Sequence, residues 1–190
     1  MTQAEIFETF KARAESVSAE VHHFARKGAA LDFILEFLSK EKEAVNNDAP
    51  FLALWADCPF LNGLDKSLLA DKVPNLRFDV TRDLAANARV GISQMDWGLA
   101  NTGTLVQDAT AVAQRLVSTL PNIHIAIVHS SEILADLPTL LTKADPKRAA
   151  YISLITGPSR TADIERVLTI GVHGPERLII VAVDELGETN

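Results

Sequence analysis

The sequence has 190 residues, which is the size of one domain, since domains commonly hold roughly 100–200 residues. Hydrophobic residues make up 47% and charged residues 23%, a balance typical of a globular protein with a full core. The net charge of −7 argues against sequence-independent binding of nucleic acid, which requires clustered Lys and Arg.

Segments with helical spacing alternate along the chain with short apolar runs that are typical of strands. In chain order, the predicted elements are a helix over 3–26 that Gly28 ends, a helix over 29–44, a loop over 46–50, strands over 51–55, 76–80, 90–93 and 98–106, a helix over 110–120, a strand over 124–128, a helix over 132–141, a strand over 151–155, a helix over 162–169 and a strand over 178–183. This alternation favours an α/β fold in which helices cover a mostly parallel sheet.

The domain organisation follows from the same pattern. Residues 1–48 are expected to form a helical N-terminal arm, and residues 49–190 a single α/β unit. The polar stretch Asn46–Pro50 is the linker candidate between the two parts.

Several kinds of site and location are disfavoured by the sequence. No apolar run approaches the roughly 18–20 residues of a transmembrane helix, and the polar N-terminus lacks the apolar region of a signal peptide, so we expect a cytoplasmic protein. The single cysteine, Cys58, excludes an internal disulfide and a cysteine-ligated iron–sulfur cluster built from this chain alone. No pair of histidines has the spacing of metal ligands, so we predict no metal site.

The stretch Thr156–Glu165 is dense in polar side chains between two predicted strands. Because it follows a strand, we expect it at the carboxyl edge of the sheet, where open α/β sheets bind ligands. Free backbone N–H groups at the start of a helix favour an anion, and Arg160 adds a possible bidentate contact. A capped turn without a ligand explains the same residues equally well. The ligand-binding candidates in this stretch are Gly157, Ser159, Arg160 and Thr161.

A second polar block, Asn101–Thr104, interrupts an apolar run. A glycine between two threonines indicates either a small ligand-binding loop or a tight turn or bulge without a ligand. The binding candidates here are Asp96, Thr102, Gly103 and Thr104, and Gly174 joins them from a later loop. The acid–base candidates are Asp163, Glu165 and His173.

Three blocks of the sequence together resemble the lactate-utilisation protein C family, which carries the LUD domain. They run from Gly91 to Leu105, from Thr156 to Glu165 and from Gly171 to Pro175. The resemblance is strong over residues 75–184. Many relatives carry an acidic residue where this chain has Asn101.

The resemblance implies a fold and a pathway. The fold would be the three-layer α/β/α arrangement shared with glucosamine-phosphate isomerase, ribose-phosphate isomerase and CoA transferases. The protein would act with two partner proteins, one of them carrying iron–sulfur clusters, in the oxidation of L-lactate to pyruvate, with no cofactor in this chain. Two other interpretations remain open: a non-catalytic assembly or regulatory module, and an enzyme acting on a nucleotide, a CoA ester or a folate.

Overall fold

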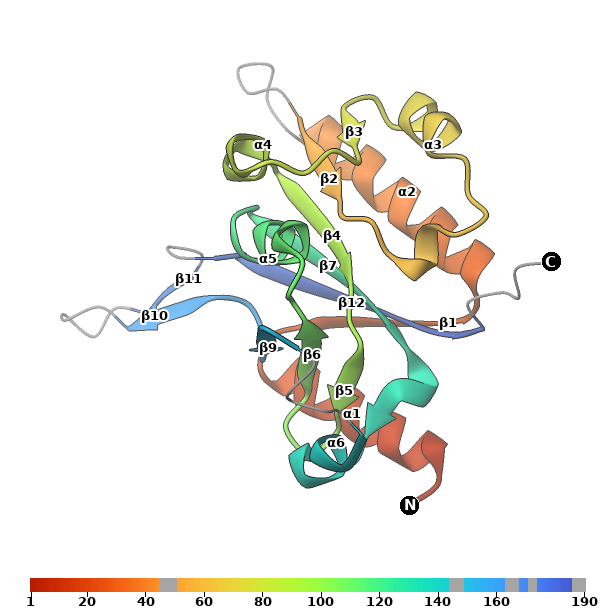
Figure 1. The fold of residues 1–190 in the computed structure, drawn as a ribbon, viewed down its shortest axis with the longest axis vertical. Helices are drawn as coiled ribbons and strands as arrows, with labels where there is room; N and C mark the ends of the chain where they lie inside the picture. The colour runs from red at the N-terminus through yellow and green to blue at the C-terminus, as the bar shows by residue number, and fades with distance from the viewer. Residues whose placement is uncertain (45–50, 144–148, 163–167, 171–173, 186–190) are drawn as a thin grey trace.

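The computed structural model describes residues 1–44, 51–143, 149–162, 168–170 and 174–185. Its centre is a six-stranded sheet in the order β1-β12-β7-β4-β2-β3, and every neighbouring pair in it is parallel (Figure 1). The strands are β1 (Glu20–Arg26), β2 (Ala53–Trp55), β3 (Leu76–Arg77), β4 (Val90–Gln94), β7 (Ile123–His129) and β12 (Arg177–Glu185).

A second, four-stranded sheet has the order β8-β5-β6-β9 and is mainly antiparallel. A two-stranded antiparallel pair, β10 and β11, lies apart from it. The strands are β5 (Trp97–Leu99), β6 (Thr104–Asp108), β8 (Ile133–Leu134), β9 (Ile152–Ile155), β10 (Arg160–Ala162) and β11 (Leu168–Ile170).

Helices cover both faces of the parallel sheet. One face carries α2 and α3, and the other carries α1, α4 and α5 together with the small sheet, against which α6 also packs. The helices are α1 (Gln3–Ser16), α2 (Lys27–Ala44), α3 (Lys66–Lys72), α4 (Arg82–Asn87), α5 (Val112–Thr119) and α6 (Leu137–Lys143), with short 3-10 turns η1 (Pro59–Leu61) and η2 (Ser130–Glu132). The predicted α/β fold with a mostly parallel, helix-covered sheet is confirmed.

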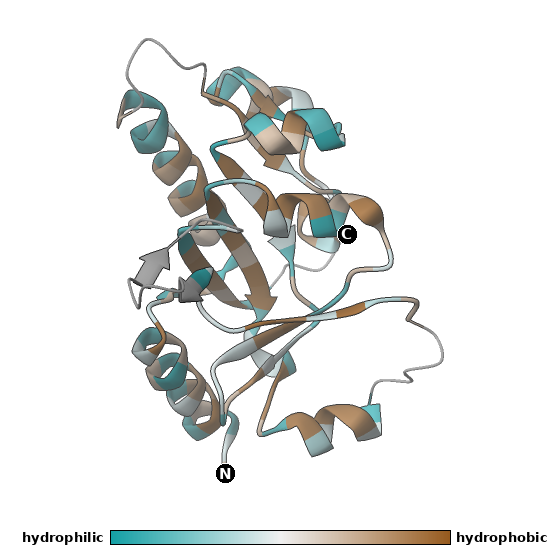
Figure 2. Ribbon diagram, turned by 90° about the vertical axis from the view of Figure 1, so that its left-hand side faces the viewer, coloured by the Kyte–Doolittle hydropathy of each residue, from teal (hydrophilic) through white to brown (hydrophobic). Residues whose placement is uncertain are grey.

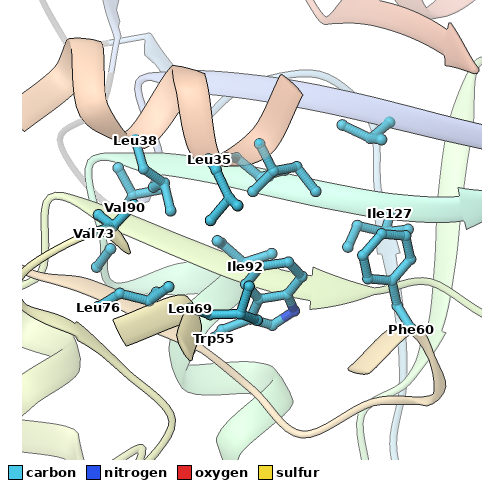
Figure 3. Packing of buried hydrophobic residues seen from close by; sticks show 14 of the residues in the cluster. Leu35, Leu38, Trp55, Phe60, Leu69, Val73, Leu76, Val90, Ile92 and Ile127 are labelled. Atoms are coloured by element: carbon cyan, nitrogen blue, oxygen red, sulfur yellow. The ribbon is translucent and has the colours of Figure 1, made fainter. Parts of the chain in front are cut away.

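The core follows the alternation of the central strands. Ile123, Ile125 and Ile127 of β7 face α2 and join the largest cluster, which includes the fully buried Trp55 (Figure 3). Ala126 of the same strand faces α1 and the small sheet. Strands buried on both faces read as continuous apolar runs, which is why β7 and β12 were predictable from sequence. Figure 2 shows much brown along the central strands, while the helices carry both teal and brown residues.

The predicted helix over 3–26 is wrong beyond Ser16. The backbone N–H groups of Val17, Ser18 and Ala19 donate to carbonyls of the last turn of α1, and Ser18 takes a left-handed conformation with φ of 71°. The chain then enters β1, which pairs with β12 across a long stretch of sequence. The N-terminal segment is therefore helical except for an edge strand of the parallel sheet.

Other boundaries also differ from the predictions. Gly28 does not end a helix but lies inside α2, and the run predicted as one strand over 98–106 is the β5–β6 hairpin. The predicted helix over 132–141 is divided between η2, β8 and the start of α6. The described ends of the predicted helix over 162–169 are strands β10 and β11, and the predicted loop over 46–50 lies outside the described residues. Among the described helices, none is long and apolar enough to cross a membrane.

An ion-pair network joins α2 to the amino ends of the parallel strands. Glu41, whose side chain is only 12% exposed, accepts hydrogen bonds from Arg89 at 3.2 Å and from Arg177 at 2.8 Å. Arg177 also pairs with Glu20 of β1 at 2.8 Å, and Arg89 pairs with Glu176 at 2.9 Å. One mostly buried carboxylate, that of Glu41, thus pairs with two guanidinium groups.

We expect Glu41→Gln to lower the free energy of unfolding by about 2 kcal/mol, because it removes the charge that compensates two partly buried arginines. Urea denaturation of the two proteins measures the change. Glu36→Gln, in the exposed pair with Lys40 on the same helix, is the control and should barely change stability. Equal effects of the two substitutions would contradict a special role for Glu41.

Candidate functional site

Two of the predicted polar blocks meet beside the carboxyl end of α1. The Thr104 hydroxyl lies 2.8 Å from the Thr156 hydroxyl and 2.7 Å from that of Thr102. Thr104 is buried, with 4% of its surface exposed. The hydrogen bond between Thr104 and Thr156 therefore joins segments that are 52 residues apart in sequence.

The glycines of these blocks lie directly against α1. Gly103 has a φ of 65°, and a Cβ atom there would lie 2.3 Å from the backbone nitrogen of Ala14. Gly157 has a φ of 70°, and its Cβ would lie 2.4 Å from the carbonyl oxygen of Val17. Only glycine fits both the backbone conformation and the close approach of the helix. The two glycines thus have a packing explanation that is independent of a ligand.

We expect Thr104→Val to cost about 1 kcal/mol of stability, because it removes a buried hydroxyl and its hydrogen bonds to Thr102 and Thr156 while the shape of the side chain is kept. Thr102→Val, at an exposed position of the same hydroxyl chain, should cost less. Chemical denaturation checks the order of the two effects, and an unchanged midpoint for Thr104→Val would contradict it.

The stretch after β9 lies at the amino edge of the parallel sheet, contrary to the prediction. The backbone N–H of Ser159 donates to the carbonyl of Pro175 at 2.8 Å, just before β12 begins. Arg160 is exposed, and its Nη2 donates to the Ser18 hydroxyl at 2.6 Å, just before β1 begins. Gly174 packs against Ser159, with 3.1 Å between their Cβ positions. The reason is that β9 belongs to the small antiparallel sheet, so its carboxyl end does not coincide with that of the large sheet.

Asp96 is separated from the threonine block. It lies at the β4 end of the β5–β6 hairpin, whereas Thr102 lies at the hairpin turn. Its carboxylate accepts a hydrogen bond of 2.6 Å from the backbone N–H of Asp108. Although Asp96 reaches the surface, desolvation by the surrounding protein atoms raises the pKa of its carboxyl group, and this outweighs the hydrogen bond.

The acid–base candidates Asp163, Glu165 and His173 lie outside the described residues. Thr161 is described only as part of the backbone of β10. Among the described residues, no group of three His, Cys, Asp or Glu side chains is placed to hold a metal ion.

A different polar cluster lies at the carboxyl edge of the parallel sheet. His23 Nε2 lies 2.7 Å from Asp184 Oδ1, near the end of β12. The hydroxyl of Ser130, which follows β7, donates to the same carboxylate oxygen at 2.5 Å. These three residues, which we call the carboxyl-edge cluster, come from three neighbouring strands or strand ends.

The carboxyl-edge cluster borders a cavity of about 280 Å³. The first turns of α1 form its other wall, and the Phe7 ring lies 4.2 Å from the His23 ring between centroids. The Gln3 amide nitrogen donates to the carbonyls of Ser130 at 2.7 Å and of Ile133 at 3.1 Å, which fixes the helix end in place. The lining residues are Gln3, Ala4, Phe7, Glu8, His23, Ser130 and Asp184.

The carboxylate is at the centre of this cluster. Desolvation favours the neutral form of Asp184, but hydrogen bonds from Ser130 and His23 outweigh it, so the pKa of Asp184 lies below its usual range. In a serine–histidine–aspartate triad the histidine lies between the other two residues, whereas here Asp184 does. The geometry is therefore that of a histidine–carboxylate pair and not that of an activated serine.

Sequence reasoning missed the carboxyl-edge cluster because it assigned His23 to a helix. The visible signals were Ser130, two residues after the predicted strand over 124–128, and Asp184, directly after the predicted strand over 178–183. In a parallel sheet such residues gather at one edge. His23 joins the cluster only because β1 pairs with β12, and no local sequence pattern indicates that pairing.

Comparison with known proteins places the chain in a family. A family model described as the LUD domain matches residues 7–183. Lactate utilization protein C of Geobacillus sp. (strain WCH70) is 32% identical over 209 aligned residues, covering 97% of this chain and 80% of that protein. Lactate utilization protein C 1 of Bacillus mycoides (strain KBAB4) is 37% identical over 62% of this chain and 50% of its own length.

Two further comparisons agree. The uncharacterized protein YkgG of Escherichia coli (strain K12) is 34% identical over 53% of this chain and 46% of its own length. In several of these comparisons the chain spans about half the length of the relative that it matches. The crystal structure of a DUF162 family protein from Deinococcus radiodurans has a TM-score of 0.62, with 18% identity, over 96% of this chain and 99% of that one. At that identity the likeness supports the fold alone. By the match over residues 7–183, the chain belongs to the LUD domain family.

Proposed function

We propose that this chain takes part in lactate utilisation, as one component of a cytoplasmic multi-protein system that oxidises L-lactate to pyruvate. The observation that carries the proposal is its similarity to relatives named lactate utilization protein C, one of which aligns with 97% of the chain. In this proposal, two partner proteins complete the system, and one of them carries the iron–sulfur clusters.

The cysteine content supports electron transfer through a partner. Cysteine-ligated iron–sulfur clusters usually take four thiolates, and this chain has one cysteine. Cys58 is buried, and desolvation raises the pKa of its thiol above the usual value, which disfavours the thiolate needed for ligation or nucleophilic attack.

Deletion of the gene in the source organism tests this function. We expect growth on L-lactate as sole carbon source to be lost while growth on pyruvate continues, and a plasmid copy of the chain to restore it. Normal growth of the deletion strain on L-lactate would contradict the proposal.

Arg160 is the candidate for binding an anionic group at the amino edge. Its guanidinium is exposed and donates a hydrogen bond to the Ser18 hydroxyl, and planar donors of this kind suit carboxylates. In the same complementation assay, Arg160→Ala should abolish growth on L-lactate without loss of the folded protein. Growth at the normal rate would remove Arg160 from the site.

An assembly or regulatory module is the second candidate function, and one observation favours it. Gly103 and Gly157 pack against the backbone of α1, so the two loops that contain them need no ligand to explain their glycines. If this second function is the correct one, substitutions in the surface around Arg160 should abolish copurification with the iron–sulfur partner. The purified chain should then bind no lactate.

A further inference from the structure

We propose that two copies of this chain associate through the outer edge of β1, so that the parallel sheet continues from one copy into the other across a twofold axis. The two β1 strands then lie antiparallel, and His23 of one copy lies opposite His23 of the second copy. This association goes beyond the proposed role in lactate utilisation and does not depend on it.

The length of β1 is the first argument. The strand has seven residues and pairs with β12 along one side, while no strand of the described residues pairs with its other side. The opposite edge of the same sheet is formed by β3, which has only two residues. Proteins shorten or cover exposed sheet edges because unpaired backbone N–H and C=O groups attract another strand. The long outer edge of β1 therefore offers backbone partners to a second strand.

The charges at the two ends of β1 are complementary in one antiparallel register. When His23 lies opposite itself, Glu20 of each copy lies opposite Arg26 of the other. Side chains alternate along a strand, so these two positions lie on the same face of the sheet. A register with Glu20 opposite Glu20, or Arg26 opposite Arg26, places like charges together and is unfavourable. The sequence of the edge strand thus favours the register centred on His23.

The ion-pair network at the amino edge supplies a second charge argument. It contains three carboxylates and two guanidinium groups, so one negative charge is left over. Its members are Glu20, Glu41, Glu176, Arg89 and Arg177. Arg177 donates to both oxygens of Glu20, at 2.8 and 3.1 Å, but a carboxylate has about four acceptor positions. Arg26 of the second copy would bring the missing positive charge to this carboxylate.

Arg26 is placed to make this contact. Its side chain is exposed, and within the described residues it makes no hydrogen bond or ion pair. It belongs to the last position of β1, where its neighbour across β12 is Glu185. The pairing therefore recruits an arginine that the fold of one chain does not use.

The side chains between the charged ends also match. In the register centred on His23, His22 of one copy lies opposite Phe24 of the other, and cross-strand pairs of ring side chains stabilise a sheet. Both rings already pack against Phe33 of α2, with centroids 4.4 and 5.3 Å from its ring. The twofold axis repeats each of these contacts, so the pairing joins two aromatic groups into one.

Sedimentation velocity of the purified chain over a range of concentrations tests the association. We expect a species with twice the mass of one chain. Arg26→Glu brings two carboxylates together at both ends of the paired strands, so the dissociation constant should rise at least about tenfold. Arg26→Lys keeps the charge and should still dimerise. Arg82→Glu, at an exposed position of α4, makes the same change of charge elsewhere and should associate like the unchanged protein.

Disulfide cross-linking tests the register. Facing residues of antiparallel strands have Cα atoms about 4.5–5.5 Å apart, which a disulfide can span. His23→Cys should therefore link two chains under mild oxidation. The two copies of Ala25 are four positions apart along the paired strands, about 13 Å, so Ala25→Cys should not link them. The natural Cys58 is buried.

A single chain at every concentration would overturn the proposal, and so would an Arg26→Glu variant that associates as tightly as the unchanged protein. Equal cross-linking of His23→Cys and Ala25→Cys would also overturn it. His23 contacts Asp184 within the chain, so urea denaturation must show that His23→Cys is folded. If that variant is unstable, the Arg26 variants still decide the question, because they alter no contact within the described chain.

Discussion

Gly103→Ala should destabilise the protein by about 2–4 kcal/mol, one of the largest effects that we expect for any single methyl group in this chain. The residue has a φ of 65°, which disfavours a side chain, and the added Cβ would lie 2.3 Å from the backbone nitrogen of Ala14. Backbone atoms of a packed helix cannot move aside as a flexible side chain can. Either α1 shifts away from the β5–β6 turn or the turn itself opens.

Gly63→Ala is the matched control for this substitution. Gly63 also has a positive φ, of 75°, but no atom lies within 4 Å of its would-be Cβ. Its alanine variant should lose only the conformational contribution, about 1 kcal/mol. Urea denaturation of both variants separates the two effects. A loss at Gly103 no greater than that at Gly63 would contradict the close packing of α1.

The second large effect is acid sensitivity caused by His124. This residue of β7 is fully buried, and its Nε2 lies 2.8 Å from the Ser93 hydroxyl on the neighbouring strand, while Nδ1 has no partner among the described residues. Burial lowers the pKa of His124 from 6.5 to about 3. Below about pH 6.5 the unfolded chain binds a proton that the folded chain does not, so the free energy of unfolding falls as the pH falls toward 3.

Between pH 8 and pH 5, this single group should remove about 2 kcal/mol of stability. The His124→Gln variant has no titrating group at this position. Its loss of stability between pH 8 and pH 5 should therefore be smaller than that of the unchanged protein by about 2 kcal/mol. Denaturation midpoints at the two pH values measure the difference. Parallel pH profiles for the two proteins would show that His124 is not the origin of the acid sensitivity.

The central strands were predictable because their environment is uniform. β7 and β12 are covered on both faces, so their sequences are apolar throughout and need no knowledge of their partners. The edge strand β1 is different. Its burial is partial and its sequence contains His22 and His23, so the apolar spacing around it also fits a helix, and only pairing with β12 decides between them.

The candidate site was predictable in part for the same reason. The sequence identified Thr102–Thr104 and the stretch beginning at Thr156 as related blocks, and the Thr104–Thr156 hydrogen bond shows that they do meet. It could not show that they meet at the amino edge, because that depends on β9 joining a second, antiparallel sheet. The carboxyl-edge cluster was missed since it needs three segments that are brought together only by the order of the parallel strands.

The two candidate locations lie toward opposite ends of α1. The threonine and glycine blocks contact its last turn, and the cavity is bounded by its first turns. A helix of 14 residues is about 21 Å long, since each residue adds roughly 1.5 Å. One molecule the size of lactate therefore cannot contact both locations, and their variants can be judged separately.

The most direct test of the account is growth on L-lactate of cells whose only copy of this chain carries Arg160→Ala. The Arg160 side chain is exposed, so the protein should accumulate normally, and Arg77→Ala, in the exposed pair with Asp79, provides the control for loss of a surface arginine. The account predicts loss of growth on L-lactate for Arg160→Ala, normal growth for Arg77→Ala, and growth of both on pyruvate. Normal growth of the Arg160→Ala strain on L-lactate would contradict it.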